Sequence, residues 1–274
     1  MNKRFKGGLR FILVTVGIVI LTSFTIDATD TFRGSQSALS IIADRSFAPT
    51  CPSDMVKIDN GDEKFCIDTF EVSAGEGCSI KNPSSVADTA ININQKACLP
   101  ESKKDTLPWT NISLHQAQVV CSKAGKYLAT ANDWYLAALG TPDTTDCNIN
   151  GSLSTTGEYQ NCQSGVGAYD MVGNVWEMVA GEVVNGRYLD SNLPEEGYVE
   201  TADQSGIART TTSTPQVIYN EDYFWSEINP NKVYAVMRGG FYGAKEDAGL
   251  YSVHTAIDVN FSGPAIGFRC ALRL

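Results

Sequence analysis

Residues 238–270 read RGGFYGAKEDAGLYSVHTAIDVNFSGPAIGFRC, and this stretch decides the fold because both of its ends are distinctive. Arg238-Gly239-Gly240 opens it, and Gly267-Phe268-Arg269-Cys270 closes it. Between these ends lie small, aromatic and short polar residues, with no set of side chains that could form a catalytic centre. The two ends therefore indicate the kind of protein, and the residues between them argue against catalysis.

The whole chain is globular and acidic. Its 274 residues, 43% of them hydrophobic, can form one large core or two modest ones. Without the four basic residues of its first ten positions the chain has 21 − 4 = 17 Lys and Arg against 31 Asp and Glu, a formal charge of −14. Such a surface should repel nucleic acid and anionic lipid, so no nucleic-acid partner is expected. Two interpretations of the acidity stay open: it serves solubility, or some of the carboxylates bind calcium.

The first 26 residues form a targeting or anchoring segment, because a basic start precedes an apolar run from Phe11 to Ile26. At about 1.5 Å per residue this run spans roughly 24 Å, less than a hydrocarbon core of about 30 Å. A cleaved signal peptide and an N-terminal membrane anchor both remain open. In either case the rest of the chain is expected to be exported, and to be secreted or held at the cell surface.

One folded domain is expected after this segment. Residues 27–50 are rich in Ser, Thr, Asp and Ala without a sustained period, which is typical of a flexible tether. Residues 51–274 contain neither an internal repeat nor a second linker, so they are expected to fold as a single domain.

The eight cysteines of an exported chain predict up to four disulfides: Cys51, Cys66, Cys78, Cys98, Cys121, Cys147, Cys162 and Cys270. No CxxC pair occurs, and His115 and His254 are the only histidines. The ligand spacings of a tetrahedral zinc site are therefore absent.

Capping signals predict two short helices. The first starts with Ser113 as its N-cap and Gln116 three residues later, and ends at Gly125. The second starts with Thr130 and stops at Gly140. Short apolar pieces at Val217–Tyr219 and Tyr234–Met237 predict strands between Gly-, Asn- and Thr-rich turns. The predicted class is α+β, rich in loops and short strands.

Four motifs resemble one family in the same order along the chain: CSKAGKYLATANDW (residues 121–134), GAYDMVGNVWE (167–177), RGG (238–240) and GFRC (267–270). They are similar to those of the formylglycine-generating enzyme, or sulfatase-modifying factor, family. The resemblance covers the chain from about Cys51 to its C-terminus, and it implies a C-type-lectin-like fold.

Enzymes of that family oxidise a substrate cysteine with two cysteines of their own and copper, and those cysteines follow the Arg-Gly-Gly element closely. The matching positions here are Ala244 and Gly249. Without a thiolate there is no nucleophile and no soft ligand for cuprous ion, so neither copper nor formylglycine formation is expected. The related iron-dependent sulfoxide synthases need several histidines, which this chain lacks.

The chain more closely resembles the variable proteins of diversity-generating retroelements, in which the segment between the same two motifs is rewritten at template adenines. An AAC codon whose adenines are replaced cannot encode Lys, Glu, Gln, Met or Trp. None of these five residues occurs between Asp247 and Phe268. Lys245 and Glu246 would have to be fixed. The resemblance therefore implies a variable region at about residues 220–270.

The same resemblance implies structural calcium. Asp170 and Glu177 would bind the ion through side chains, and Gly173 and Val175 through backbone oxygens, which suits the oxygen ligands of calcium. The alternative is that Glu177 only accepts hydrogen bonds from loop amides. A second calcium site of the family matches Asn148-Ile149, although the loop around it is shorter here than in the enzymes.

The resemblance also pairs Cys121 with Cys270, a link between the first helix and the last strand. For the other six cysteines we infer pairs of neighbours: Cys51 with Cys66, Cys78 with Cys98, and Cys147 with Cys162. Sequence alone leaves these three pairings open.

The leading hypothesis is a non-catalytic protein that binds an unknown protein or cell-surface ligand through a diversified C-terminal face. Its candidate contact residues are aromatic or short and polar, as in a paratope: Tyr223, Trp225, Phe241, Tyr242, Gly243, Ala244, Asp247, Tyr251, Ser252, His254, Asp258, Asn260 and Ser262. Two alternatives are an exported oxidase of the sulfatase-modifying type with an atypical site, and a fixed lectin-like binding or structural domain.

Overall fold

The structure is a computed structural model that describes residues 50–61 and 63–274. The expectations for the N-terminal segment and for residues 27–49 lie outside the described residues. Cys51–Leu274 form one compact unit. In the described ranges no helix is long and apolar enough to cross a bilayer.

The expected α+β class is confirmed by three short helices and many short strands in the described part of the chain. The helices are α3 (Val86–Asn94), α4 (Leu114–Lys123) and α5 (Ala131–Ala138), with 3-10 turns at η1 (Val217–Tyr219) and η2 (Lys245–Asp247). The strands are β1 (Met55–Asp59), β2 (Lys64–Asp68), β3 (Val72–Ala74), β4 (Pro100–Ser102), β5 (Tyr127–Leu128), β6 (Trp176–Val184), β7 (Arg187–Tyr188), β8 (Ser191–Asn192), β9 (Gly197–Ala202), β10 (Ala208–Thr212), β11 (Tyr223–Ser226), β12 (Val233–Arg238), β13 (Val253–Asp258), β14 (Ile266–Phe268) and β15 (Cys270–Arg273).

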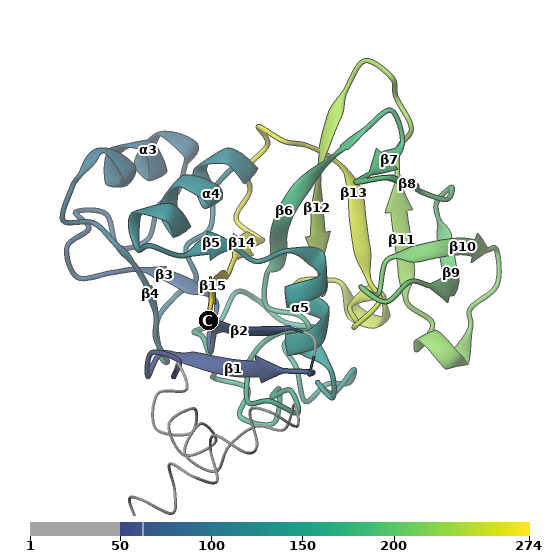
Figure 1. Cartoon of the computed structure of the whole chain (residues 1–274), viewed down its shortest axis with the longest axis horizontal. Coiled ribbons are helices and arrows are strands. Elements are labelled where there is room, and N and C mark those ends of the chain that lie inside the picture. Colours follow the sequence, from purple (N-terminus) through teal and green to yellow (C-terminus); the bar gives the residue numbers. More distant parts are fainter. Residues whose placement is uncertain (1–49, 62) are drawn as a thin grey trace, which may run out of the picture. The chain divides into compact units, whose positions relative to one another are not determined.

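The end of the chain completes a sheet that its beginning starts. In the four-stranded sheet the order is β1-β2-β15-β5, so the last strand lies between β2 and β5. A larger sheet follows the order β10-β9-β11-β13-β12-β6-β7-β8, and β14 pairs with β6. In Figure 1 this larger sheet lies to the right of α3 and α4. A short β3-β4 pair forms the remaining sheet.

The two central strands of the larger sheet, β6 and β12, face a hydrophobic core on each side. Val179 and Val236 belong to one core, which also contains Trp134. Met178 and Met237 belong to the other core, around Trp109 and Trp176. Because successive side chains of a strand point to opposite faces, strands covered on both faces are apolar at nearly every position, as these two are.

The two predicted helices are confirmed at their caps. Ser113 and Gln116 form a reciprocal capping box at the start of α4, and Thr130 and Asp133 form one at the start of α5. Helix α3 was not predicted. Its signal was present, because the Ser85 side chain accepts a hydrogen bond from the amide of Asp88, the same local pattern three residues apart.

One of the two predicted strands is wrong. Tyr234–Met237 lies within β12, as predicted, but Val217–Tyr219 forms the 3-10 turn η1. The side chains of Val217 and Ile218 are 80% exposed, so no sheet covers them. Apolar content alone does not make a strand where no neighbouring strand supplies backbone partners.

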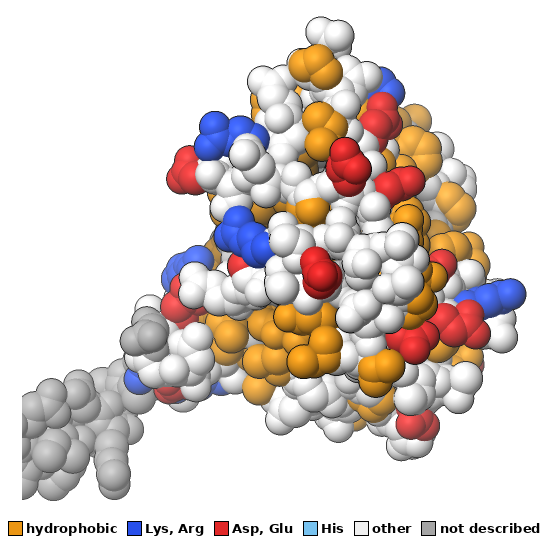
Figure 2. Space-filling model, turned by 90° about the vertical axis from the view of Figure 1, so that its right-hand side faces the viewer, with side chains coloured by type: hydrophobic (Ala, Val, Ile, Leu, Met, Phe, Trp, Pro, Cys, Tyr) orange, Lys and Arg blue, Asp and Glu red, His pale blue; other side chains and the backbone are white. Residues whose placement is uncertain are grey.

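All four predicted disulfides are present: Cys51–Cys66, Cys78–Cys98, Cys121–Cys270 and Cys147–Cys162. Since the sequence has eight cysteines, none remains as a free thiol. Four disulfides indicate an oxidising, exported environment. Figure 2 shows the side of the molecule that carries β9 and β10, where acidic side chains are dispersed over the surface.

Candidate binding site

Arg238, the first residue of the Arg-Gly-Gly element, is fully buried at the end of β12. Its guanidinium donates hydrogen bonds to the carbonyl oxygens of Ser205 at 2.9 Å and Leu250 at 3.0 Å, and lies 4.7 Å from the ring centroid of Trp134. Burial lowers the pKa of Arg238 to about 10. This side chain therefore ties the start of the segment to the β9–β10 turn and to residue 250.

The two glycines that follow Arg238 are required by backbone geometry and space. Gly239 and Gly240 have φ values of +86° and +83°. A Cβ would lie 2.4 Å from the carbonyl oxygen of Met171 at position 239, and 2.5 Å from the Cβ of Ala248 at position 240. Any other residue would be strained here.

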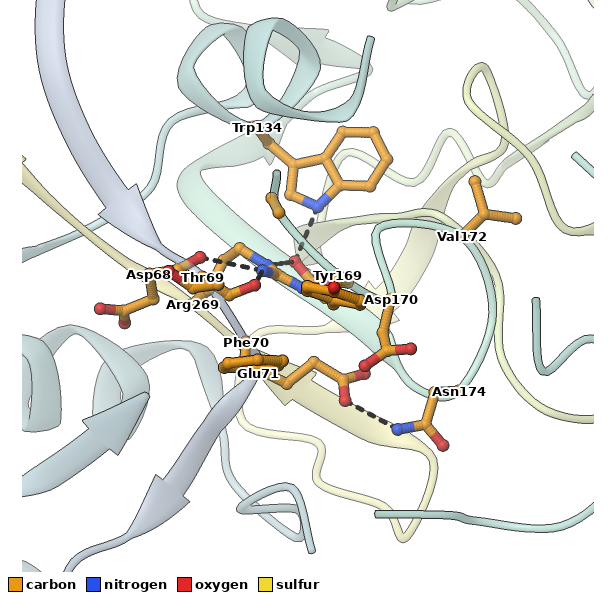
Figure 3. A network of polar contacts seen from close by, with 12 residues as sticks. Asp68, Thr69, Phe70, Glu71, Trp134, Tyr169, Asp170, Val172, Asn174 and Arg269 are labelled. Atoms are coloured by element: carbon orange, nitrogen blue, oxygen red, sulfur yellow. Dashed lines mark hydrogen bonds and ion pairs between the residues drawn. The ribbon is translucent and has the colours of Figure 1, made fainter. Parts of the chain in front are cut away.

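Arg269, the arginine of the closing motif, pairs with Glu177 in the interior. Both side chains are almost inaccessible, and the guanidinium contacts both carboxylate oxygens at 2.6–2.9 Å. The indole nitrogen of Trp134 donates to Glu177 at 2.8 Å, and Arg269 also donates to the carbonyl oxygens of Asp68 and Tyr169. Figure 3 shows Arg269 beside Asp68, Thr69 and Tyr169, with the indole of Trp134 nearby. The closing motif is thus anchored to three distant parts of the chain.

Between the two anchored ends, the structure brings predicted contact residues together around a pocket of about 270 Å³. The residues that line it are Trp176, Trp225, Phe241, Gly243, Ala244, Asp247 and His254. All except Trp176 were predicted from the sequence.

Aromatic rings form most of this pocket. Trp176, at the start of β6, packs edge-on against Trp225 of β11, with ring centroids 5.6 Å apart. His254 of β13 stacks on Trp225 at 5.8 Å and 12°. Trp176 was missed as a contact residue, although it stands in the Gly-Asn-Val-Trp-Glu motif; its place beside Trp225 depends on the pairing of distant strands.

His254 is a neutral imidazole in this environment. Its Nδ1 accepts a hydrogen bond from the amide of Ala256 at 3.2 Å, which a doubly protonated ring could not do. Burial lowers the pKa of His254 to about 4. The pocket therefore carries no positive charge from this ring at neutral pH.

Two other predicted residues adjoin the pocket. The ring of Tyr223 lies 5.0 Å from that of Trp225, and the ring of Tyr242 lies 5.2 Å from that of Phe241. Tyr223 and Tyr242 therefore extend the aromatic surface beyond the pocket itself.

Three predicted residues lie elsewhere. Asp258 pairs with Tyr234 at the far end of β13, whereas His254 pairs with Met237, a separation of roughly 13 Å along the strand. Asn260 and Ser262 follow Asp258 in the next loop. Asp258 and Asn260 are exposed, and Ser262 is half-buried. These residues do not share a surface pocket with His254.

The prediction that Ser252 contacts a ligand is wrong. Ser252 is fully buried, and its hydroxyl lies 2.5 Å from the carbonyl oxygen of Asp247 and 3.3 Å from Oδ1 of Asp222. Tyr251 is half-buried, with its hydroxyl 3.2 Å from that of Tyr135 and its ring 5.0 Å from that of Tyr219. Both residues fix the turn before β13 and lie outside the pocket lining.

The structure also places Ala244 and Gly249, the positions that match the two cysteines of the enzymes. Ala244 lines the pocket. At Gly249 a Cβ would lie 1.8 Å from Oδ1 of Asp222, so a cysteine would fit here only if the Asp222 side chain moved. Asp222 itself is buried and accepts a hydrogen bond from the amide of Tyr251 at 2.6 Å. Sequence reasoning missed Asp222, whose role depends on residues about thirty positions away.

Asp170, one of the predicted calcium ligands, belongs to a buried acidic network with Glu71 and Glu177. Figure 3 shows Asp170 and Glu71 close to Asn174. Asp170 accepts a hydrogen bond from the amide of Gly157 at 2.6 Å, and burial raises its pKa to about 6. Glu71, which was not predicted, is also buried; burial and the nearby Asp170 and Glu177 raise its pKa well above the usual value. A single arginine, Arg269, faces these three carboxyl groups.

The fit of this network to calcium is uneven. Glu177 already accepts hydrogen bonds from Arg269 and Trp134 on both oxygens, so its geometry does not favour a metal ligand. Glu71 Oε1 and Asn148 Oδ1, in contrast, are buried without a hydrogen-bond partner. The side chain of Asn174 links these two residues through hydrogen bonds of 2.7 Å to Glu71 and 3.1 Å to Asn148. Buried oxygen atoms that accept no hydrogen bond are free to coordinate a calcium ion.

The remaining predicted ligand positions give no further support to a calcium site. Among the described residues no group of three or more His, Cys, Asp or Glu side chains is arranged to hold a metal. The carbonyl oxygen of Ile149 accepts a hydrogen bond from the amide of Lys245 at 2.7 Å. The two calcium sites, including the backbone ligands Gly173 and Val175, therefore remain predictions.

Calcium removal tests this prediction. If Asp170 and Glu71 hold the ion, chelation should lower Tm by roughly 5–10 °C when calcium is initially at about 100 times its Kd, because a ligand bound only to the folded state stabilises it. The measurement is a thermal melt with EDTA, then with calcium restored. Asp170→Asn should abolish the response, and Asp190→Asn, at an exposed turn, should retain it. A Tm that does not change on chelation would contradict the calcium site.

Comparison with known proteins supports the resemblance indicated by the motifs. Residues 144–274 match the family model described as the sulfatase-modifying factor enzyme 1-like domain. This match supports the C-type-lectin-like fold that the resemblance implied. No curated protein matches the chain.

Similar solved structures share low sequence identity with this chain. They include the Major Tropism Determinant U1 variant (15% identity, TM-score 0.48, 82% of this chain and 54% of that chain covered) and CarF (16%, 0.45, 81% and 99%). Treponema denticola variable protein 1 is a further example (12%, 0.36, 82% and 100%). The chain spans about half the length of the Major Tropism Determinant variants. Likenesses of this order carry no argument about function.

Proposed function

We propose that this protein is a non-catalytic ligand-binding protein, secreted or displayed at the cell surface, whose C-terminal face is diversified by a retroelement. The observation that carries the proposal is the composition of the pocket. Its Trp176 comes from the Gly-Asn-Val-Trp-Glu motif, and its other lining residues come from positions 225–254. The pocket thus combines rings at positions outside the segment 238–270, Trp176 and Trp225, with the proposed variable positions Asp247 and His254. Fixed rings beside replaceable residues suit a binding site that changes its ligand.

The environment of the cysteine positions supports the absence of catalysis. All eight cysteines form disulfides, so no thiolate is available for copper or for a substrate cysteine. The Cβ of a cysteine at position 249 would collide with the Asp222 carboxylate as it stands. An oxidase of the sulfatase-modifying type would require a reactive thiol. A free-thiol titration of the folded protein that finds no thiol would exclude this alternative.

Exposure within the segment restricts where diversification can occur. Asp247, Asp258 and Asn260 are exposed, and His254 lines the pocket. Ser252 is buried against Asp222 and Asp247, so a change there would leave a cavity or an unpaired polar group in the interior. The proposed variable face therefore includes 247, 254, 258 and 260, and excludes 252.

The proposal includes export and membrane association. The disulfides favour an oxidising compartment, and the basic-apolar start of the sequence favours a signal peptide or membrane anchor followed by a tether to the domain at 51–274. The partner would be a protein or another cell-surface ligand, bound through the variable face.

The genome around the gene provides the test. We expect a reverse transcriptase gene nearby and a near-copy of the codons for residues 238–270. The gene and its copy should differ in the codons for 247, 254, 258 and 260, and the copy should have adenine at each differing position. They should be identical in the codons for 245, 246 and 252. Absence of such a copy would overturn diversification and favour a fixed lectin-like domain. Differences at codon 252 would contradict the exclusion of buried positions.

A further inference from the structure

The one charged side chain that lines the pocket is acidic. Of its lining residues, four have aromatic rings (Trp176, Trp225, Phe241 and His254) and one is charged, Asp247. Asp247 is exposed at the end of η2. Neither lysine nor arginine lines the pocket. The lining thus offers ring faces and one carboxylate, and no cationic group for an anion.

A second depression of ≈ 440 Å³ continues this acidic and aromatic character. It is lined by Glu195, Glu196, Gly197, Tyr198, Thr211, Thr212, Ser213 and Tyr223. Tyr223 joins the two depressions, because its ring lies 5.1 Å from that of Tyr198 and 5.0 Å from that of Trp225. Burial and then the carboxylates of Glu196 and Asp247 raise the pKa of Tyr223. Both depressions therefore present acids beside rings.

Neither His254 nor the nearby Lys245 adds a positive charge to the pocket lining. The imidazole of His254 accepts a hydrogen bond at Nδ1 and is neutral. Lys245 precedes Asp247 by two residues, but it is exposed and does not line the pocket. An incoming cation thus meets a carboxylate and the faces of electron-rich rings, which attract it electrostatically, most strongly for tryptophan.

We propose that the pocket around Trp176 and Trp225 binds an organic cation, the lysine or arginine side chain of a ligand protein, with Asp247 as its counter-charge. This inference rests on the proposed binding function and names the chemistry that the site recognises. An anionic ligand would find no donor with positive charge here. A purely apolar ligand would leave the carboxylate of Asp247 beside it without a partner, which costs free energy as water is excluded.

The test uses small probes on the full-length protein. Tryptophan fluorescence is titrated with Nα-acetyl-arginine amide and Nα-acetyl-lysine amide, and with their uncharged analogues, Nα-acetyl-citrulline amide and Nα-acetyl-norleucine amide. At least one cation should bind saturably, and about 2- to 30-fold more tightly than its uncharged analogue, the range expected of a cation over aromatic rings.

Matched variants locate the effect. Asp247→Asn should reduce the preference for the cation, and Trp225→Leu should weaken binding of the cation itself. Asp190→Asn, the same change at an exposed position outside both depressions, should leave binding unchanged. The folded state of each variant is checked by its melting curve, and a correctly folded Asp247→Asn that keeps the full preference would contradict the role of Asp247.

Other outcomes are also decisive. Equal affinity for the cation and its uncharged analogue, or no saturable response to either cation, would overturn the proposal. Binding of a neutral methyl glycoside in place of the cations would overturn it in favour of a carbohydrate site. If no cation binds, the proposal of diversification is unaffected, because it is tested by the codon comparison. If no template repeat is found, the proposal of cation binding is still tested by these titrations.

Discussion

Replacing Arg269 by methionine is expected to lower the free energy of unfolding by about 3–5 kcal/mol, because it leaves buried carboxylates without their counter-charge. Arg269 contacts both oxygens of Glu177, and both side chains are inaccessible to water. Glu71 and Asp170 belong to the same network. The loss is measured by urea denaturation of the folded protein.

A double-mutant cycle separates the ion pair from packing. Replacing Glu177 as well, in Arg269→Met/Glu177→Met, should recover part of the loss, since an apolar pair of similar volume can substitute for a buried ion pair. Arg273→Met is the control: its guanidinium is 3.5 Å from Asp133 but the side chain is 57% exposed, so about 0–1 kcal/mol is expected. A loss for Arg269→Met as small as that of the control would show that the buried pair does not anchor the closing motif.

Removal of the Cys121–Cys270 disulfide by Cys121→Ala/Cys270→Ala is expected to lower the free energy of unfolding by about 5 kcal/mol on the chain-entropy model. The bridge spans 149 residues and links α4 to β15. Cross-linking so long a loop greatly restricts the unfolded chain, and the cost of its removal grows with the logarithm of the loop length.

The comparison is with a short bridge in the same protein. Cys51→Ala/Cys66→Ala opens a loop of 15 residues, for which about 3 kcal/mol is expected. Both double variants avoid a leftover thiol, so denaturant unfolding can be compared directly. If the short bridge contributes as much as the long one, or more, loop entropy is not what makes Cys121–Cys270 important.

These two predictions concern the support of the proposed binding face rather than the face itself. Arg238 and Arg269 are both fully buried, whereas Asp247, Asp258 and Asn260 are exposed. Substitutions at exposed positions usually change stability by less than about 0.5 kcal/mol. The separation of a buried support from exposed positions allows the surface to vary without unfolding the domain.

Sequence reasoning succeeded where the signal is local. Ser113 and Thr130 each act on an amide three residues later, so the helix starts could be predicted from short stretches. It failed where exposure depends on distant segments. Val217 and Ile218 are apolar but exposed, and Ser252 is polar but buried against Asp222, thirty residues earlier. Residue type alone does not contain that information.

By itself, then, the sequence determined the α+β class, two of the helices, the number of cysteines available for disulfides and the absence of cysteine at 244 and 249. The structure then showed which cysteines pair. The features determined by the sequence follow from local capping, from composition and from motifs. Only the tertiary structure decided that Glu177 meets Arg269, 92 residues away, and that Trp176 forms a pocket with Trp225 and His254. The physical reason is that strand pairing and burial set which distant side chains come into contact, and charge and exposure at a site follow from those contacts.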